Sequence, residues 1–134
     1  MSRAFFPLFG LLFLILVFLM TGCDQGPNTG TVSGVVTLDG KPTAAIQIRF
    51  SPASGRPGVG FTDAEGRYTL RYTQNADGCI PGPNRVTLEA YSSPADATTQ
   101  FLPERYNVNA GDNPELQVEV KPGKNVFNFD LLSQ

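Results

Sequence analysis

Two cysteines and a few carboxylates are the side chains with the most chemistry to offer in this 134-residue sequence. The chain contains no histidine, which excludes a histidine general base, a Ser-His or Cys-His nucleophile pair and a histidine-containing metal site. Paired carboxylates could still serve a glycosidase, but Asp63 and Glu65 are expected in an open turn rather than a cleft. We therefore predict a non-enzyme without catalytic residues, cofactor or metal.

Cys23 follows an uncharged apolar run, residues 4–20, which Arg3 precedes. A positive start, an apolar centre and small residues before a cleavage point are typical of a secretory signal. A retained membrane span is the alternative, although the run is at the short limit for crossing a bilayer. The motif Met20-Thr21-Gly22-Cys23 resembles the bacterial lipobox, in which the cysteine receives diacylglycerol and becomes the new N-terminus. The resemblance implies a signal peptide over 1–22 and lipidation of Cys23.

Acyl chains on Cys23 would tether the protein to a membrane that faces the periplasm or the cell exterior. Asp24 resembles a signal that keeps some lipoproteins at the inner membrane, and the choice between inner and outer membrane stays open. Residues 23–30 form the lipidated cysteine and a polar linker rich in Pro and Gly, which holds the domain within about 25 Å of the bilayer. The sequence has ten basic residues, Arg3 among them, and twelve acidic ones. Because this balance gives no net positive charge, we predict no nucleic-acid partner.

Residues 31–134 show an alternation of apolar and polar positions with period two and no helical pattern, which predicts an all-β domain. Asp39-Gly40 is typical of a type I′ hairpin turn, and Asp63 and Gly66 fit the first and fourth positions of a type I turn. The expected strands are 31–38, 44–50, 59–62, 67–73, 85–91, 116–121 and 126–132. Seven short strands favour a monomeric immunoglobulin-like sandwich.

A family resemblance runs through nearly all of the mature chain. Its motifs are Gly34-x-Val36, Asp39-Gly40-Lys41-Pro42, Thr62-Asp63-x-x-Gly66-x-Tyr68, Pro81-Gly82-x-x-x-Val86 and Asn125-x-Phe127-x-Phe129-x-Leu131. These resemble the carboxypeptidase regulatory-like, transthyretin-like domain and the small envelope lipoproteins that consist of it. The resemblance implies a prealbumin-like sandwich and a structural or accessory role in the cell envelope. A binding module for a peptide, a glycan or a small apolar ligand is the alternative.

Cys79 would be the single free thiol if Cys23 is lipidated, so no internal disulfide can form. Burial as a small apolar residue is the expectation, while a nucleophile, a redox sensor or an intermolecular bridge are the alternatives. Asp63, Glu65 and Asp77 lack the ligand spacing of a calcium loop, so turn capping is preferred to metal binding. Outward Arg67 and Arg71, together with Arg49, could meet an anionic partner or simply be solvated.

The longest irregular segment, 92–114, is the predicted partner surface, because long loops without regular structure are frequently functional. Phe101, Arg105 and Tyr106 are its candidate contact residues for an envelope protein or glycan, since aromatic and Arg side chains are enriched at interfaces. The competing interpretation is that Phe101 and Leu102 cover an edge of the sandwich.

Overall fold

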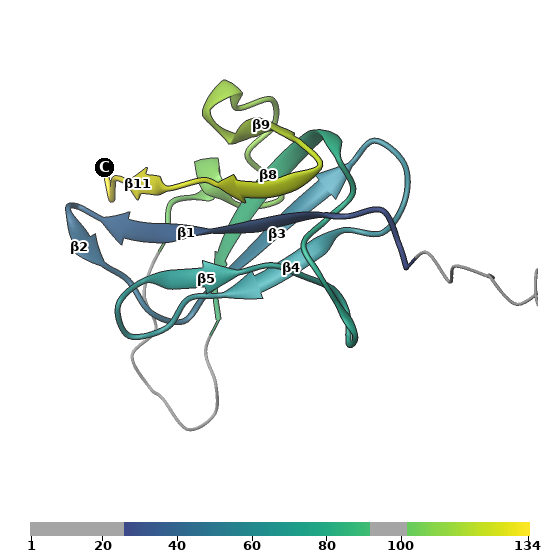
Figure 1. Ribbon diagram of the computed structural model, residues 1–134. Helices are drawn as coiled ribbons and strands as arrows, with labels where there is room; N and C mark the ends of the chain where they lie inside the picture. Colours follow the sequence, from purple (N-terminus) through teal and green to yellow (C-terminus); the bar gives the residue numbers. More distant parts are fainter. Residues whose placement is uncertain (1–25, 92–101) are drawn as a thin grey trace, which may run out of the picture.

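Two facing β-sheets form the domain in the computed structural model, which describes residues 26–91 and 102–134 (Figure 1). The first sheet is centred on β1 (Gly30–Leu38), and the second is centred on β3 (Ile46–Pro52) and β8 (Gly82–Ala90). The remaining strands of the first sheet are β2 (Lys41–Pro42), β5 (Arg67–Thr69), β10 (Gly123–Val126) and β11 (Phe129–Leu131). The remaining strands of the second are β4 (Gly58–Phe61), β6 (Arg71–Thr73), β7 (Ala76–Asp77) and β9 (Gln117–Val120).

The pairing is antiparallel throughout the second sheet, in the order β7-β6-β4-β3-β8-β9. In the first sheet β2 and β5 pair antiparallel with β1, whereas β10 and β11 pair parallel with it. Two short 3₁₀ helices, η1 (Glu104–Tyr106) and η2 (Pro114–Leu116), lie between β8 and β9 in the chain. The prediction of an all-β sandwich is thereby confirmed.

The core lies between the sheets and follows from the alternation of apolar residues. Ile46, Ile48 and Phe50 of β3 are fully buried, and the intervening Arg49 is exposed. Val32 and Val36 of β1 face them from the first sheet and are likewise fully buried. Since alternate residues of a strand point to opposite faces, each sheet buries one face and exposes the other.

Both predicted turns are present. Asp39 and Gly40 have φ values of 50° and 79°, as the type I′ turn between β1 and β2 requires. A carboxylate oxygen of Asp63 accepts hydrogen bonds from the backbone N–H groups of Glu65 and Arg67, at 3.0 and 2.9 Å. This is the turn capping that was preferred to metal binding.

The structure contains eleven strands in its described ranges, where the sequence predicted seven. The predicted strand 67–73 is divided at Leu70, because β5 pairs with β1 in the first sheet and β6 pairs with β4 in the second. The backbone N–H of buried Leu70 donates to the carbonyl of Val32 at the crossing. The short strands β2, β7 and β10 are additional.

The start of β1 and the C-terminus lie at opposite ends of the sandwich (Figure 1). Gly30, where the described chain enters β1, exchanges two backbone hydrogen bonds with Cys79, at 2.9 and 3.0 Å. The C-terminal residues follow β11, whose Leu131 lies beside Leu38 at the far end of β1. Among residues 26–91 and 102–134 no helix is both long and apolar enough to cross a membrane. The apolar run 4–20 and Cys23 lie outside the described residues.

Candidate functional site

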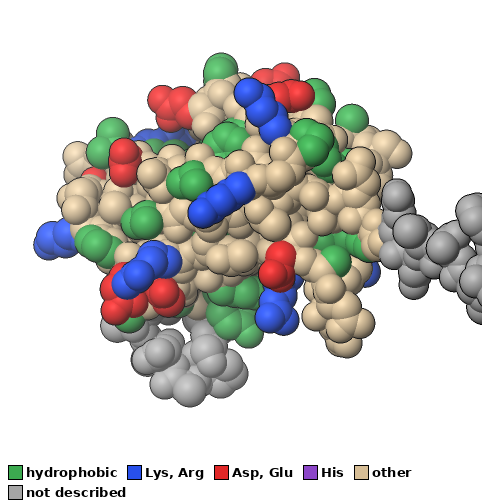
Figure 2. All heavy atoms as spheres, in the orientation of Figure 1, with side chains coloured by type: hydrophobic (Ala, Val, Ile, Leu, Met, Phe, Trp, Pro, Cys, Tyr) green, Lys and Arg blue, Asp and Glu red, His purple; other side chains and the backbone are tan. Residues whose placement is uncertain are grey.

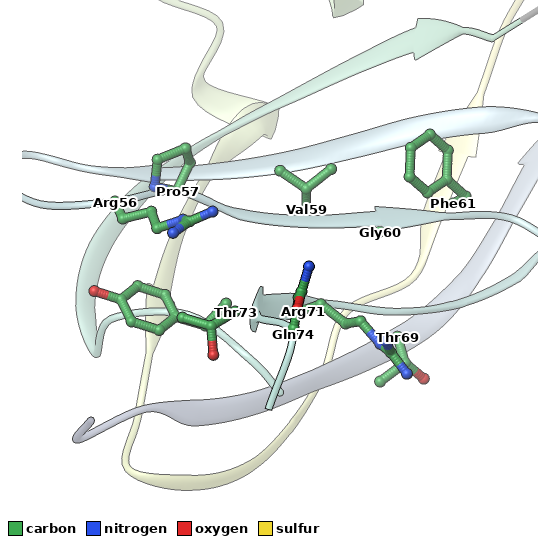
Figure 3. A pocket seen from close by; sticks show the side chains of 10 residues that line it. Arg56, Pro57, Val59, Gly60, Phe61, Thr69, Arg71, Thr73 and Gln74 are labelled. Carbon is green, nitrogen blue, oxygen red and sulfur yellow. The ribbon is translucent and has the colours of Figure 1, made fainter. Parts of the chain in front are cut away.

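An open groove of about 460 Å³ lies on the outer face of the second sheet, over β4 and β6. Figure 3 shows Val59 and Phe61 extending from β4, with Arg56 next to Pro57 at the end away from Phe61, and Arg71, Thr73 and Gln74 across from β4. The lining thus combines apolar side chains, short polar groups and two guanidinium groups: Arg56, Pro57, Val59, Gly60, Phe61, Thr69, Arg71, Tyr72, Thr73 and Gln74.

The groove exists because β4 turns its apolar residues outward. Gly58 and Gly60 face inward, where a Cβ on Gly58 would lie 2.5 Å from the carbonyl oxygen of Gly78. A Cβ on Gly60 would lie 2.7 Å from the carbonyl oxygen of Thr69. Larger residues cannot fit at these positions, so Val59 and Phe61 must alternate to the solvent side.

Phe61 is a partly fixed aromatic side chain at one end of the groove. The residue is 50% exposed, and its ring meets the ring of Tyr91 at a centroid distance of 5.3 Å in an edge-to-face arrangement. Such a pair stabilises the orientation of both rings. One side of Phe61 is held by Tyr91, and the ring remains accessible to a ligand in the groove.

Positive charge flanks the groove. Arg71 pairs across the sheet with Val59, which in turn pairs with Arg49 on β3. The Nε atom of Arg71 lies 3.9 Å from a carboxylate oxygen of Asp77, and the two side chains are 72% and 59% exposed. A contact of that length between exposed groups is weak, so the guanidinium stays available for another anion.

The predicted cationic stripe can be followed in this arrangement. Thr69 of β5 and Arg71 of β6 both line the groove, and Arg67 precedes Thr69 by two residues, so alternation places it on the same side of the strand. Arg67 itself does not line the groove. Arg49 and Arg71 share a face, on either side of Val59. A second, smaller hollow of about 100 Å³ continues beyond Arg49 and is lined by Gln47, Arg49, Thr87, Glu89 and Val108.

The structure places two of the three predicted contact residues, Arg105 and Tyr106, on η1. Tyr106 is buried in the core, so the expectation that its ring stays exposed is wrong. Arg105 is exposed; its guanidinium lies 4.9 Å from the ring centroid of Tyr106 and donates to the carbonyl groups of Leu132 and Gln134. These contacts fasten the C-terminus to η1. Phe101 lies outside the described residues, and the partner role of Arg105 stays a prediction.

Leu102 is partly buried against the core, in keeping with the interpretation that this part of the chain covers an edge of the sandwich.

Cys79 is fully buried, as expected, and burial raises the pKa of its thiol to about 11. The described parts of the chain hold no group of three or more Cys, Asp or Glu side chains arranged to bind a metal ion. Asp63 and Glu65 belong to the turn already described, and Asp77 faces Arg71.

Of the ten residues that line the groove, sequence reasoning singled out Arg71 and missed the others, among them Arg56, Phe61 and Tyr72. The signal that could have indicated Phe61 is the run Gly58-Val59-Gly60-Phe61, in which glycine alternates with apolar residues. When glycine occupies every second position of a strand, a close backbone approach on that side turns the larger residues outward.

No family model and no curated protein matches the chain. A DUF3823 family protein from Parabacteroides merdae is similar in structure, with a TM-score of 0.44 and 16% identity over 78% of this chain and 46% of that one. The chain therefore spans less than half of that protein. The dioxygenase domain of a dioxygenase carbohydrate-binding protein fusion from Streptomyces sp. SirexAA-E gives a TM-score of 0.42 and 23% identity over 83% and 84% of the two chains.

Proposed function

We propose that this chain is a non-catalytic lipoprotein module of the bacterial cell envelope, tethered through Cys23, with an accessory role in binding. Its domain would be a carboxypeptidase regulatory-like sandwich of the immunoglobulin-like or prealbumin-like type. The observation that carries the binding role is the open groove over β4 and β6, with its exposed aromatic and guanidinium groups. Grooves that combine apolar walls with a few polar groups are the usual form of a ligand site.

The position of Gly30 supports the tether. The linker expected after Cys23 would reach the sandwich at Gly30, which is hydrogen-bonded in both directions to Cys79. Residues Lys121 and Lys124 are exposed at the same end, since Gly30 pairs with Gly123. Two cations beside the tether would favour an orientation in which this end faces anionic headgroups. The groove lies on a sheet face, so it would remain open in that orientation.

The chemistry of Cys79 supports a non-catalytic role. A thiol acts as a nucleophile through its thiolate, and burial disfavours that form here. The sequence offers no histidine to activate it. The carboxylate of Asp63 accepts hydrogen bonds from the backbone of its own turn, and the residues that line the groove include no carboxylate, so the groove is suited to binding rather than bond cleavage.

Replacement of Cys23 tests the tether. The wild-type chain expressed in a bacterium with lipoprotein processing is expected in the membrane fraction, with acyl chains detected by mass spectrometry on its N-terminal cysteine. Cys23→Ser should yield an uncleaved precursor without lipid, whereas Cys79→Ala, the matched control, should be processed normally. Secretion of the wild-type chain without acyl chains would overturn the proposal.

A further inference from the structure

We infer that the groove over β4 and β6 binds a polysaccharide that carries carboxylate groups. This inference rests on the proposed binding role and names its ligand class. It combines three features of the lining, namely guanidinium groups, exposed aromatic rings and short polar side chains, with the place of the groove in the sheet.

The guanidinium groups select for an anion. Arg56 and Arg71 both line the groove, and Arg49 lies one strand further along the same face. Asp77 is the carboxylate that faces Arg71, and Glu89 lines the adjoining hollow with Arg49, so the arginines outnumber the carboxylates. Arginine binds a carboxylate through two parallel hydrogen bonds from its planar group, and the weak contact with Asp77 leaves most of these donors available.

The rest of the lining suits sugar rings. Phe61 offers an exposed ring that Tyr91 holds in place, and Tyr72 adds a second aromatic ring to the lining. A pyranose presents an apolar face of C–H groups that can pack on such rings, while its hydroxyl groups need partners around the edge. Thr69, Thr73 and Gln74 supply hydroxyl and amide groups for that purpose.

The place of the groove disfavours an acidic peptide. Extended peptides usually bind by adding a strand to a free sheet edge, where backbone N–H and C=O groups are unpaired. Here the central strand of the groove, β4, is hydrogen-bonded to β3 on one side and to β6 on the other. A ligand in the groove therefore meets side chains rather than free backbone, as a polysaccharide would.

The test measures binding of polygalacturonate to the full mature chain, isolated from cells and kept in a non-ionic detergent. Isothermal titration calorimetry should detect binding that weakens with added NaCl, because exposed charges are screened. Fully methyl-esterified polygalacturonate, which keeps the backbone and lacks the charge, should not bind. Polyglutamate probes the peptide alternative and should bind more weakly than polygalacturonate.

The variants assign binding to the groove. Arg56→Gln and Arg71→Gln should each weaken binding by about threefold to tenfold, and Phe61→Ala should weaken it as well. Lys124→Gln is the matched control, because Lys124 is exposed on β10 of the first sheet and does not line the groove. Acidic and basic side chains are interspersed on the face that Figure 2 shows, so the loss of one cation outside the groove should leave binding unchanged. Asp77→Asn should leave binding unchanged or tighter, since it removes the carboxylate that competes for Arg71.

Three results would overturn the inference: no binding of polygalacturonate, equal binding of its methyl ester, or preference for polyglutamate. An equal loss in Lys124→Gln, or a loss in Asp77→Asn, would also count against it, because either would indicate a general or structural effect. The assay requires no membrane. A failure of lipid attachment at Cys23 and a failure of ligand binding are therefore separate results.

Discussion

The phenol oxygen of Tyr106 accepts a hydrogen bond of 3.0 Å from the backbone N–H of Leu132, which joins η1 to the end of the chain beyond β11. The ring is 4% exposed and belongs to the core cluster. Tyr106 therefore serves the packing of the sandwich, with its polar atom satisfying a backbone donor. Sequence reasoning placed this tyrosine on a partner surface. In the structure it connects the segment after β8 to the C-terminus, through its packing in the core and its hydrogen bond to Leu132.

Removing that hydroxyl should lower stability without disturbing the core. Tyr106→Phe keeps the ring and leaves the Leu132 N–H without its partner, so we expect the free energy of unfolding to fall by about 1 kcal/mol. Urea denaturation followed by circular dichroism measures this change. Tyr91→Phe is the control, because the Tyr91 ring is half exposed, and it should be neutral. Equal effects of the two variants would contradict the assigned role.

A side chain at Gly34 should be far more damaging. A Cβ at this position would overlap the carbonyl oxygen of Phe127, which also accepts a 2.6 Å hydrogen bond from the Tyr68 hydroxyl. Gly34→Ala must push apart β1 and the segment between β10 and β11, so we expect a loss of roughly 3 kcal/mol or more. Thermal unfolding is the measurement. Gly26→Ala, where no atom lies within 4 Å of the new Cβ, should leave the melting temperature unchanged.

The sequence was sufficient to predict those strands and turns that are determined by residues close together in the chain. Strand β3 was predicted from its alternation, and the turn at Asp39 and Gly40 from residues that tolerate positive φ. Glycine inside a strand marks a close approach, and the structure shows one at Gly34, beside the carbonyl oxygen of Phe127. In each case one residue or one short period determines the local structure.

The features that sequence reasoning missed depend on contacts between distant segments. The alternation in residues 67–73 continues unbroken through Leu70, so nothing local marks the point where the chain passes from one sheet to the other. The parallel pairing of β10 and β11 with β1 joins residues about ninety positions apart. The groove shares this origin, because Arg56, Phe61 and Arg71 come together through the pairing of β4 with β6.

Asp39 should make stability depend on acid. Its carboxylate accepts hydrogen bonds from the side chain and the backbone N–H of Ser133, and these hold the pKa of Asp39 below its ordinary value of 3.8. Because the pKa of Asp39 is lower in the folded protein, its carboxylate stabilises the folded state at pH values above 3.8. This stabilisation is lost as the pH falls through the pKa that Asp39 has in the folded protein.

Asp39→Asn tests this linkage, because asparagine also tolerates the positive φ of the turn. We expect the variant to be slightly less stable than wild type at pH 7 and the difference to shrink below pH 4. Urea midpoints at a series of pH values give the comparison. A difference that grew on acidification would show that the carboxylate is not stabilised in the folded protein.

Cys79 should be unreactive in the folded protein and reactive after unfolding. The side chain is fully buried, and burial raises the pKa of the thiol from 9.0 to about 11, so the thiolate is scarce at pH 8. Ellman's reagent should therefore label the native chain slowly and the chain in 6 M guanidinium quickly.

Because the pKa of the Cys79 thiol is raised in the folded protein, its contribution to stability is full below pH 9 and is lost as pH rises towards 11. The difference in free energy of unfolding between wild type and Cys79→Ala should accordingly narrow between pH 9 and pH 11. In the labelling experiment, rapid reaction of the native thiol at pH 8 would contradict the burial of Cys79 beneath Gly30 and Gly58.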